Sequence, residues 1–178
     1  KARILGVTAT PQRLDGKGLK SISDTLVEGA TAAWLIENGF LAKPQYWAPP
    51  GPDMDGVKMI AGDFDQREIE RRMDQRVITG NAIAEYRRHS DGLQAIAFCC
   101  SVKHAQDVAE AFTEAGYPSE CIHGGTPDRK ELMERFRTAT TKILTNCDLI
   151  GEGVDVPAVG AAILLRPTAS LGLHLQQI

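Results

Sequence analysis

Four short apolar runs after residue 92, separated by more polar segments, constrain the fold of this chain more than any other feature. Residues 93–99, LQAIAFC, are apolar almost throughout, which is typical of a parallel strand covered on both faces. Similar but shorter runs follow at residues 120–123, 142–145 and 161–165. Each run has the length of a strand rather than of a helix. We therefore expect four strands in the second half of the chain.

Two helices are predicted between the first three of these runs. Apolar residues recur at helical spacing after the first run, and Gly116 is the expected end of that helix. After the second run, Thr126 and Pro127 fit an N-cap followed by proline at the first helical position, and Leu132 and Phe136 belong to the apolar face. Strands that alternate with helices in this way favour right-handed βαβ units. The predicted fold class is α/β, an open parallel sheet with helices on both faces.

The first 92 residues are less regular. Residues 30–38 suit a helix that ends at Gly39, and residues 45–48 allow one short strand before two prolines. Residues 51–62 contain three glycines and predict a surface loop. Residues 64–88 are helical in character and rich in charge, with a break expected near residues 73–75.

Composition restricts the function as well. The chain has 178 residues and a formal net charge of −3, so no global basic field attracts it to nucleic acid, and any phosphate must be bound by local groups. No apolar run approaches the roughly 20 residues of a membrane-spanning helix. The four cysteines contain no CxxC pair, so metal-site spacing is absent. We interpret them as buried side chains in a reducing compartment and expect a cytoplasmic protein.

A glycine-rich turn follows the third run. Gly151 and Gly153 flank a glutamate, and Asp155 lies between two valines. Ligands of open parallel sheets bind at the carboxyl ends of the strands, where glycines let the backbone approach them, and a carboxylate there accepts hydrogen bonds from a ribose. Thr145 and Asn146 add short polar side chains at the strand end. The plain alternative is a connection that uses glycine for its geometry alone.

The elements that bind a triphosphate most strongly do not occur in this sequence. The pattern G-x-x-x-x-G-K-[ST] is missing, since the one Gly-Lys pair, Gly16-Lys17, is followed by glycine. There is also no Asp-Glu pair that would hold magnesium. We therefore expect no catalytic residue and no metal ligand in this chain, and no ATP hydrolysis by the chain alone.

Several short motifs together resemble the C-terminal RecA-like lobe of superfamily 2 helicases, of the DEAD/DEAH-like and type III restriction-subunit-like kind. The motifs occur in the family's order. Thr8-Ala9-Thr10-Pro11 resembles motif III, and Phe98 with Ser101 resembles motif IV; His123-Gly124 and Phe136 follow. Residues 144–159 resemble motif V, and the run up to Gln176 resembles the start of motif VI. The sequence begins without methionine and ends within a helical pattern, so we expect a fragment of a longer protein. The resemblance implies three parts: residues 1–20 from the end of the first RecA-like lobe, residues 21–90 as linker and leading helices, and residues 91–178 as the second lobe.

The resemblance also implies roles for individual residues. The nucleotide would be contacted by Gly153, Asp155 and Gln176. The nucleic-acid backbone would lie along Ser101, Thr145, Asn146 and Gly151. Thr8 and Thr10 would couple the nucleotide state of the first lobe to the path of the nucleic-acid strand. ATP and Mg²⁺ would be held mainly by the missing N-terminal lobe, which would be a partner of this one. The nucleic acid is expected to be DNA rather than RNA, because motif III reads Thr-Ala-Thr-Pro.

Two other functions remain open at this point. The chain could be a non-catalytic nucleotide-binding or interaction module with a Rossmann-like sheet, or it could belong to the motor subunit of a restriction or repair complex that translocates on duplex without unwinding it. The aromatic residues Trp34, Tyr46 and Trp47 could stack on bases, but packing is the simpler interpretation. The mixed charges of residues 65–76 favour a solvated helix face.

Overall fold

The computed structural model describes residues 5–7, 23–60, 62–73, 76–150, 156–169 and 174. Within these residues the elements are α1 (Ala32–Glu37), β1 (Met59–Ile60), β2 (Asp63–Phe64), α2 (Gln66–Met73), α3 (Arg76–His89), β3 (Gln94–Cys99), α4 (Val102–Glu114), β4 (Ser119–Ile122), α5 (Arg129–Arg137), β5 (Ile143–Asn146) and β6 (Val159–Leu165).

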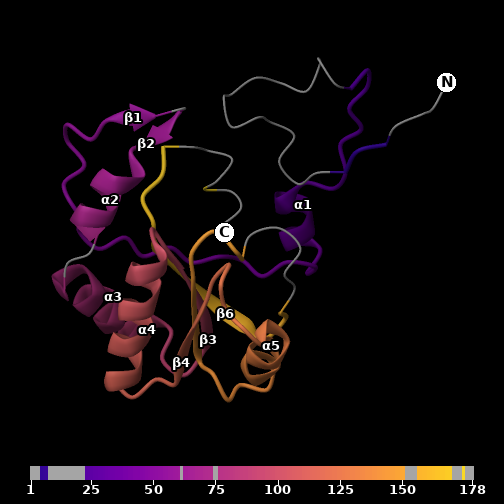
Figure 1. Cartoon of the computed structure of the whole chain (residues 1–178). Coiled ribbons are helices and arrows are strands. Elements are labelled where there is room, and N and C mark those ends of the chain that lie inside the picture. The colour runs from indigo at the N-terminus through magenta and orange to yellow at the C-terminus, as the bar shows by residue number, and fades with distance from the viewer. Residues whose placement is uncertain are drawn as a thin grey trace.

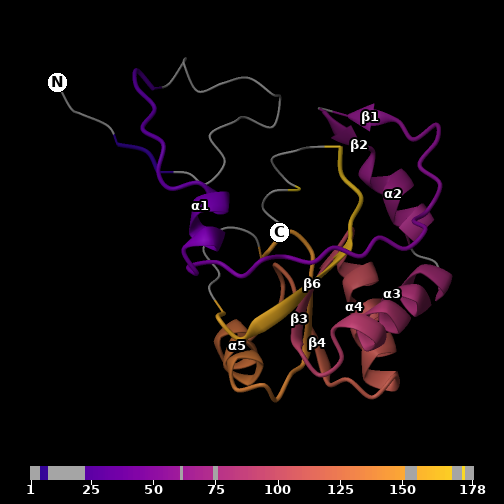
Figure 2. The same ribbon diagram turned by 180° about the vertical axis from the view of Figure 1, so that it is seen from behind.

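The larger sheet is parallel, as predicted. Its described strands lie in the order β4-β5-β3-β6, and each neighbouring pair is parallel. Figures 1 and 2 show the sheet with α3 and α4 on one side and α5 on the other. The register aligns Phe98 of β3 with Asn146 of β5 and with Leu164 of β6, and Asn146 in turn aligns with Ile122 of β4. The four strands thus end along one edge, so the loops that follow them emerge together.

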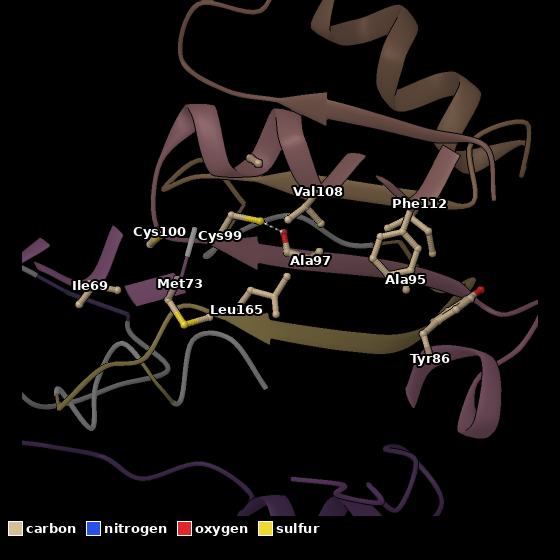
Figure 3. Close-up of a cluster of buried hydrophobic side chains, with 12 residues drawn as sticks. Ile69, Met73, Tyr86, Ala95, Ala97, Cys99, Cys100, Val108, Phe112 and Leu165 are labelled. Carbon is tan, nitrogen blue, oxygen red and sulfur yellow. Dashed lines mark hydrogen bonds between the residues drawn. The ribbon is translucent and has the colours of Figure 1, made fainter. Parts of the chain in front are cut away.

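Alternation along β3 explains why helices are needed on both faces. Ala95 and Ala97 point to one face and are fully buried under Val108 and Phe112 of α4, with Tyr86 of α3 beside them. Figure 3 shows this cluster, in which the two small alanines leave room for the aromatic rings. The ring centroids of Tyr86 and Phe112 lie 5.7 Å apart in an edge-to-face arrangement, which is favourable for aromatic pairs.

The opposite face is covered by α5. Leu132 and Phe136 of that helix form a second buried cluster with Leu144 of β5, and Ile96 and Phe98 of β3 pack against it. The apolar face predicted for this helix is therefore confirmed. A strand whose successive residues enter two different cores is apolar on both faces, and residues 93–99 were recognisable because they are apolar almost throughout.

The start of α5 differs from the prediction. The helix begins at Arg129, after Asp128, whose φ of 47° lies in the left-handed region. Thr126 is not the N-cap, since its Oγ1 accepts a hydrogen bond from the His123 N–H at 2.8 Å and so closes the turn after β4. The Thr-Pro pair is used in this turn, and the helix starts two residues after Pro127.

In the N-terminal part, the structure agrees with the predicted helices better than with the predicted strand and loop. α1 begins after Thr31, which accepts a hydrogen bond from the Trp34 N–H, and Gly39 follows it with a φ of 76°. α2 is described up to Met73 and α3 from Arg76; residues 74 and 75, where the break is expected, lie outside the described residues, so the break stays a prediction.

One strand prediction and one loop prediction in this part were wrong. Residues 45–48 are described and form no strand; the flanking prolines cannot donate to a ladder, and Trp47 instead stacks on His89 with centroids 4.3 Å apart. The predicted loop at residues 51–62 contains β1, which forms a short antiparallel hairpin with β2. None of the helices that the structure describes has both the length and the apolar character that a membrane crossing needs.

Candidate functional site at the carboxyl edge of the sheet

The carboxyl edge of the sheet brings together three segments that are far apart in the sequence. Cys100 and Ser101 follow β3, residues 147–150 follow β5, and Arg166 follows β6. Two of the residues predicted to contact nucleic acid, Ser101 and Asn146, lie here because β3 and β5 are adjacent and in register.

Ser101 is the N-cap of α4. Its backbone is extended, with φ −147° and ψ 166°, and its Oγ accepts a hydrogen bond from the His104 N–H at 3.1 Å. A hydroxyl that accepts one hydrogen bond still has a proton to donate. The positive end of the α4 dipole lies at the same point, so this is a favourable place for an anion. Ser101 is partly exposed, which leaves its hydroxyl within reach of a ligand.

Thr145 and Asn146 use their side chains inside the protein. Thr145 is fully buried, and its Oγ1 donates to the Ala105 carbonyl at 2.7 Å. The Asn146 Nδ2 donates to the Ala97 carbonyl at 3.1 Å, and its Oδ1 accepts from the Ile150 N–H at 3.3 Å. The Thr145 hydroxyl proton and one of the two Asn146 Nδ2 protons are therefore used inside the protein. The two residues join β5 to α4, to β3 and to the following loop, and so help to position the edge; their contact with nucleic acid stays a prediction.

Arg166 and Asp148 form an ion pair across the edge, which the sequence analysis did not find. Asp148 has a φ of 54°, and its carboxylate accepts from the Arg166 guanidinium. The Arg166 side chain is only 15% exposed, against 56% for Asp148, so the guanidinium is the inner member of the pair. The available signal was weak: both residues follow strands, but their contact depends on the order of the strands in the sheet.

A cavity of about 490 Å³ lies where the hairpin and α2 meet this edge. It is lined by Ile60, Asp63, Phe64, Asp65, Gln66, Arg67, Ile69, Cys100 and Arg166. The Gln66 Nε2 donates to the Cys100 carbonyl at 2.8 Å, so the start of α2 is joined directly to the end of β3. The hairpin and α2, which lie outside the predicted second lobe, thus form one wall of this cavity.

Burial keeps the cysteines of the edge protonated. It raises the pKa of the Cys100 thiol to about 12, and it also raises the pKa values of Cys99, Cys121 and Cys147. A thiol that stays protonated at neutral pH is a poor nucleophile and a poor metal ligand. Among the residues that the structure describes, no group of three or more His, Cys, Asp or Glu side chains is arranged to hold a metal ion.

His123 closes the turn after β4. Its Nδ1 accepts from the Gly125 N–H at 3.1 Å, in addition to the backbone bond to Thr126. The remaining predicted site residues lie outside the described residues: Thr8, Thr10, Gly151, Gly153, Asp155 and Gln176. Their roles stay predictions.

Comparisons with known proteins agree with this architecture. The family described as "Helicase conserved C-terminal domain" matches residues 78–178, more than half of the chain. The "51.5 kDa protein" of a Lactococcus phage (isolate 7-9) is 41% identical over 175 residues, covering 97% of this chain and 38% of the relative. The "Putative ATP-dependent helicase IRC3" of Saccharomyces cerevisiae is 24% identical over 184 residues, covering 100% of this chain and 27% of the relative.

Solved structures of low sequence identity are also similar. The helicase domain of Hef from Pyrococcus furiosus is 20% identical, with a TM-score of 0.46, over 59% of this chain and 21% of that one. This chain spans well under half the length of both curated relatives. The family match begins in α3 and includes all four strands of the parallel sheet. The parallel sheet with helices on both faces is the α/β fold that the sequence predicted. This chain belongs to the family described as "Helicase conserved C-terminal domain".

Proposed function

We propose that this chain is the C-terminal lobe of an ATP-dependent helicase or translocase that acts on DNA rather than RNA. The family match over residues 78–178 carries this proposal, because it covers the whole parallel sheet together with the edge at which Ser101 lies. The preference for DNA rests on the Thr-Ala-Thr-Pro sequence at residues 8–11 alone.

In this proposal the carboxyl edge follows the phosphate backbone. The Ser101 hydroxyl and the N-terminus of α4 would receive one phosphate, while Thr145 and Asn146 hold the neighbouring backbone in place. Such contacts do not read bases, so binding would be largely independent of sequence. It would weaken as salt rises, because each phosphate contact releases counterions.

The nucleotide would lie between this lobe and another one. We assign Gly153, Asp155 and Gln176 to the nucleotide side, with Asp155 on the ribose. Mg²⁺, which neutralises charge on the transferred phosphoryl group, and most contacts to ATP are assigned to the other lobe. This chain would then supply one side of a cleft whose closing and opening moves the two lobes along a strand. It would not hydrolyse ATP alone.

ATP turnover by the longer protein that contains this chain tests the proposal. We expect turnover that DNA stimulates more strongly than RNA of the same length. Asp155→Ala should raise the KM for ATP about tenfold or more, since a ribose contact is lost. Glu110→Gln, which removes an exposed carboxylate on α4, is the control and should leave the KM unchanged.

Each failure of this experiment has a separate meaning. Absence of stimulation by any nucleic acid would contradict the motor function and favour a non-catalytic module. Stimulation by RNA alone would contradict the DNA assignment. Stimulation by duplex without strand displacement would indicate translocation without unwinding.

A further inference from the structure

Asp63 links the hairpin to the chain that follows β6, although these segments are more than 100 residues apart in the sequence. Its Oδ1 accepts from the Ala169 N–H at 2.7 Å and from the Phe64 N–H at 2.9 Å. Its Oδ2 accepts from the Thr168 hydroxyl at 2.9 Å. The bonds from Thr168 and Ala169 join the two segments, and the bond from Phe64 orients the carboxylate within the hairpin. Hydrogen bonds to an ionised carboxylate are stronger than neutral ones, so these two bonds hold the segments together firmly.

The hairpin that carries Asp63 is itself held firmly. The Asp65 N–H donates to the Lys58 carbonyl at 2.7 Å, and the Lys58 N–H donates to the Glu68 carboxylate at 3.2 Å. The bond from Gln66 to Cys100 then fastens α2 to the end of β3. The hairpin, α2 and the central strand therefore form one connected unit. Asp63 attaches residues 168 and 169 to that unit.

We propose that Asp63 is a positioning residue that sets the path of the chain leaving β6 and so acts on the nucleotide side of the lobe. This inference rests on the proposed function, in which Gln176, a few residues beyond Ala169, faces the nucleotide. An element outside the predicted second lobe thereby takes part in nucleotide binding without touching the nucleotide. The carboxylate supplies acceptors here, and its three partners among the described hydrogen bonds are donors of this chain.

The substitution of Asp63 can be graded because asparagine has nearly the same shape. In Asp63→Asn, one oxygen remains to accept from the Phe64 and Ala169 N–H groups. In Asp63→Ala, all three bonds are lost. Asp53→Ala is the matched control: it removes an exposed carboxylate close to the hairpin in sequence that accepts a bond only from the Asp55 N–H among the described hydrogen bonds.

Two measurements on the longer protein test the proposal. Hydrogen exchange of a peptide that covers residues 166–169 should become about tenfold faster in Asp63→Ala, with Asp63→Asn close to wild type and Asp53→Ala unchanged. The KM for ATP should rise about tenfold in Asp63→Ala and recover in Asp63→Asn, while affinity for nucleic acid without nucleotide stays the same. If Asp63→Ala fails to fold, Thr168→Val removes one of the three bonds and should raise exchange and the KM by a smaller factor.

Three outcomes would overturn the inference. One is unchanged exchange at residues 166–169 in Asp63→Ala. A second is faster exchange with an unchanged KM. The third is an equal loss in Asp63→Asn and Asp63→Ala. A wild-type protein without nucleic-acid-stimulated turnover would contradict the proposed function instead, and the exchange experiment would still decide whether Asp63 holds this segment.

Discussion

The Ser101→Asp substitution separates the capping role of this residue from its proposed contact with phosphate. Aspartate is as good an N-cap as serine, and its charge interacts favourably with the helix dipole. The cap to the His104 N–H should therefore survive, and the lobe should keep its stability. The hydroxyl donor is lost, however, and a negative charge takes its place at the carboxyl edge.

The expected size of the effect follows from this geometry. Two unit charges about 4 Å apart repel by about 1 kcal/mol in bulk water and by about 4 kcal/mol at an effective dielectric constant of about 20. Ser101 is partly exposed, so the lower part of this range applies. An affinity loss of about tenfold corresponds to about 1.4 kcal/mol. Ser101→Ala removes the cap as well and should cost about 1 kcal/mol of unfolding free energy.

Fluorescence anisotropy with a labelled oligonucleotide measures the affinity of the longer protein, and urea unfolding measures the stability of each variant. Thr113→Glu provides the charge control, because it adds one negative charge at the exposed far end of α4. That end is roughly 18 Å from Ser101 at a rise of about 1.5 Å per residue, well beyond the Debye length of about 8 Å. Wild-type affinity in Ser101→Asp with stability preserved would refute the phosphate contact, and an equal loss in Thr113→Glu would show that the effect is not local.

Two further predictions concern the interior of the edge. Thr145→Val should lower the unfolding free energy by about 1 kcal/mol, since it keeps the shape of a fully buried side chain and removes the hydroxyl that donates to the Ala105 carbonyl. An unchanged midpoint of urea unfolding would contradict this. Stability should also fall as pH rises from about 9 towards 12, because burial raises the pKa of Cys100 from its ordinary value of 9.0 to about 12, so the unfolded chain loses this proton first. The fall should be smaller in Cys100→Ala, and identical pH profiles for the two proteins would show that this thiol contributes nothing.

The sequence predicted those parts of the fold whose physical cause is local. The run at residues 93–99 is apolar because it enters two cores, and the end of α4 is marked by Gly116, whose φ is 95°. The start of α5 was predicted wrongly because Thr126 can either cap the helix or close the turn after β4, and in the structure it closes the turn. The hairpin was missed because two-residue strands have no detectable periodicity.

For the candidate site, sequence reasoning located the edge but not the direction of each side chain. Ser101 lies on the partly exposed side of the edge, whereas Thr145 and Asn146 turn inward. A short polar residue at a strand end can do either, and the choice depends on which backbone carbonyls lie within reach. The contacts of Arg166 with Asp148 and of Asp63 with Thr168 require the full three-dimensional arrangement, so no local pattern indicates them.

The strand order β4-β5-β3-β6 has a consequence for how the lobe is made on the ribosome. β3 is the first strand of the large sheet to be synthesised, yet both of its partners come later: Ala95 pairs with Ile143 and with Ala161. Until those residues leave the exit tunnel, β3 has neither of the strands that flank it in the described sheet. Pairing of strands that are far apart in the sequence is slow, and the intermediates expose apolar surface that promotes aggregation. We therefore expect nascent chains that stop before residue 143 to bind chaperones or to aggregate. Chains that extend beyond β6 should do neither.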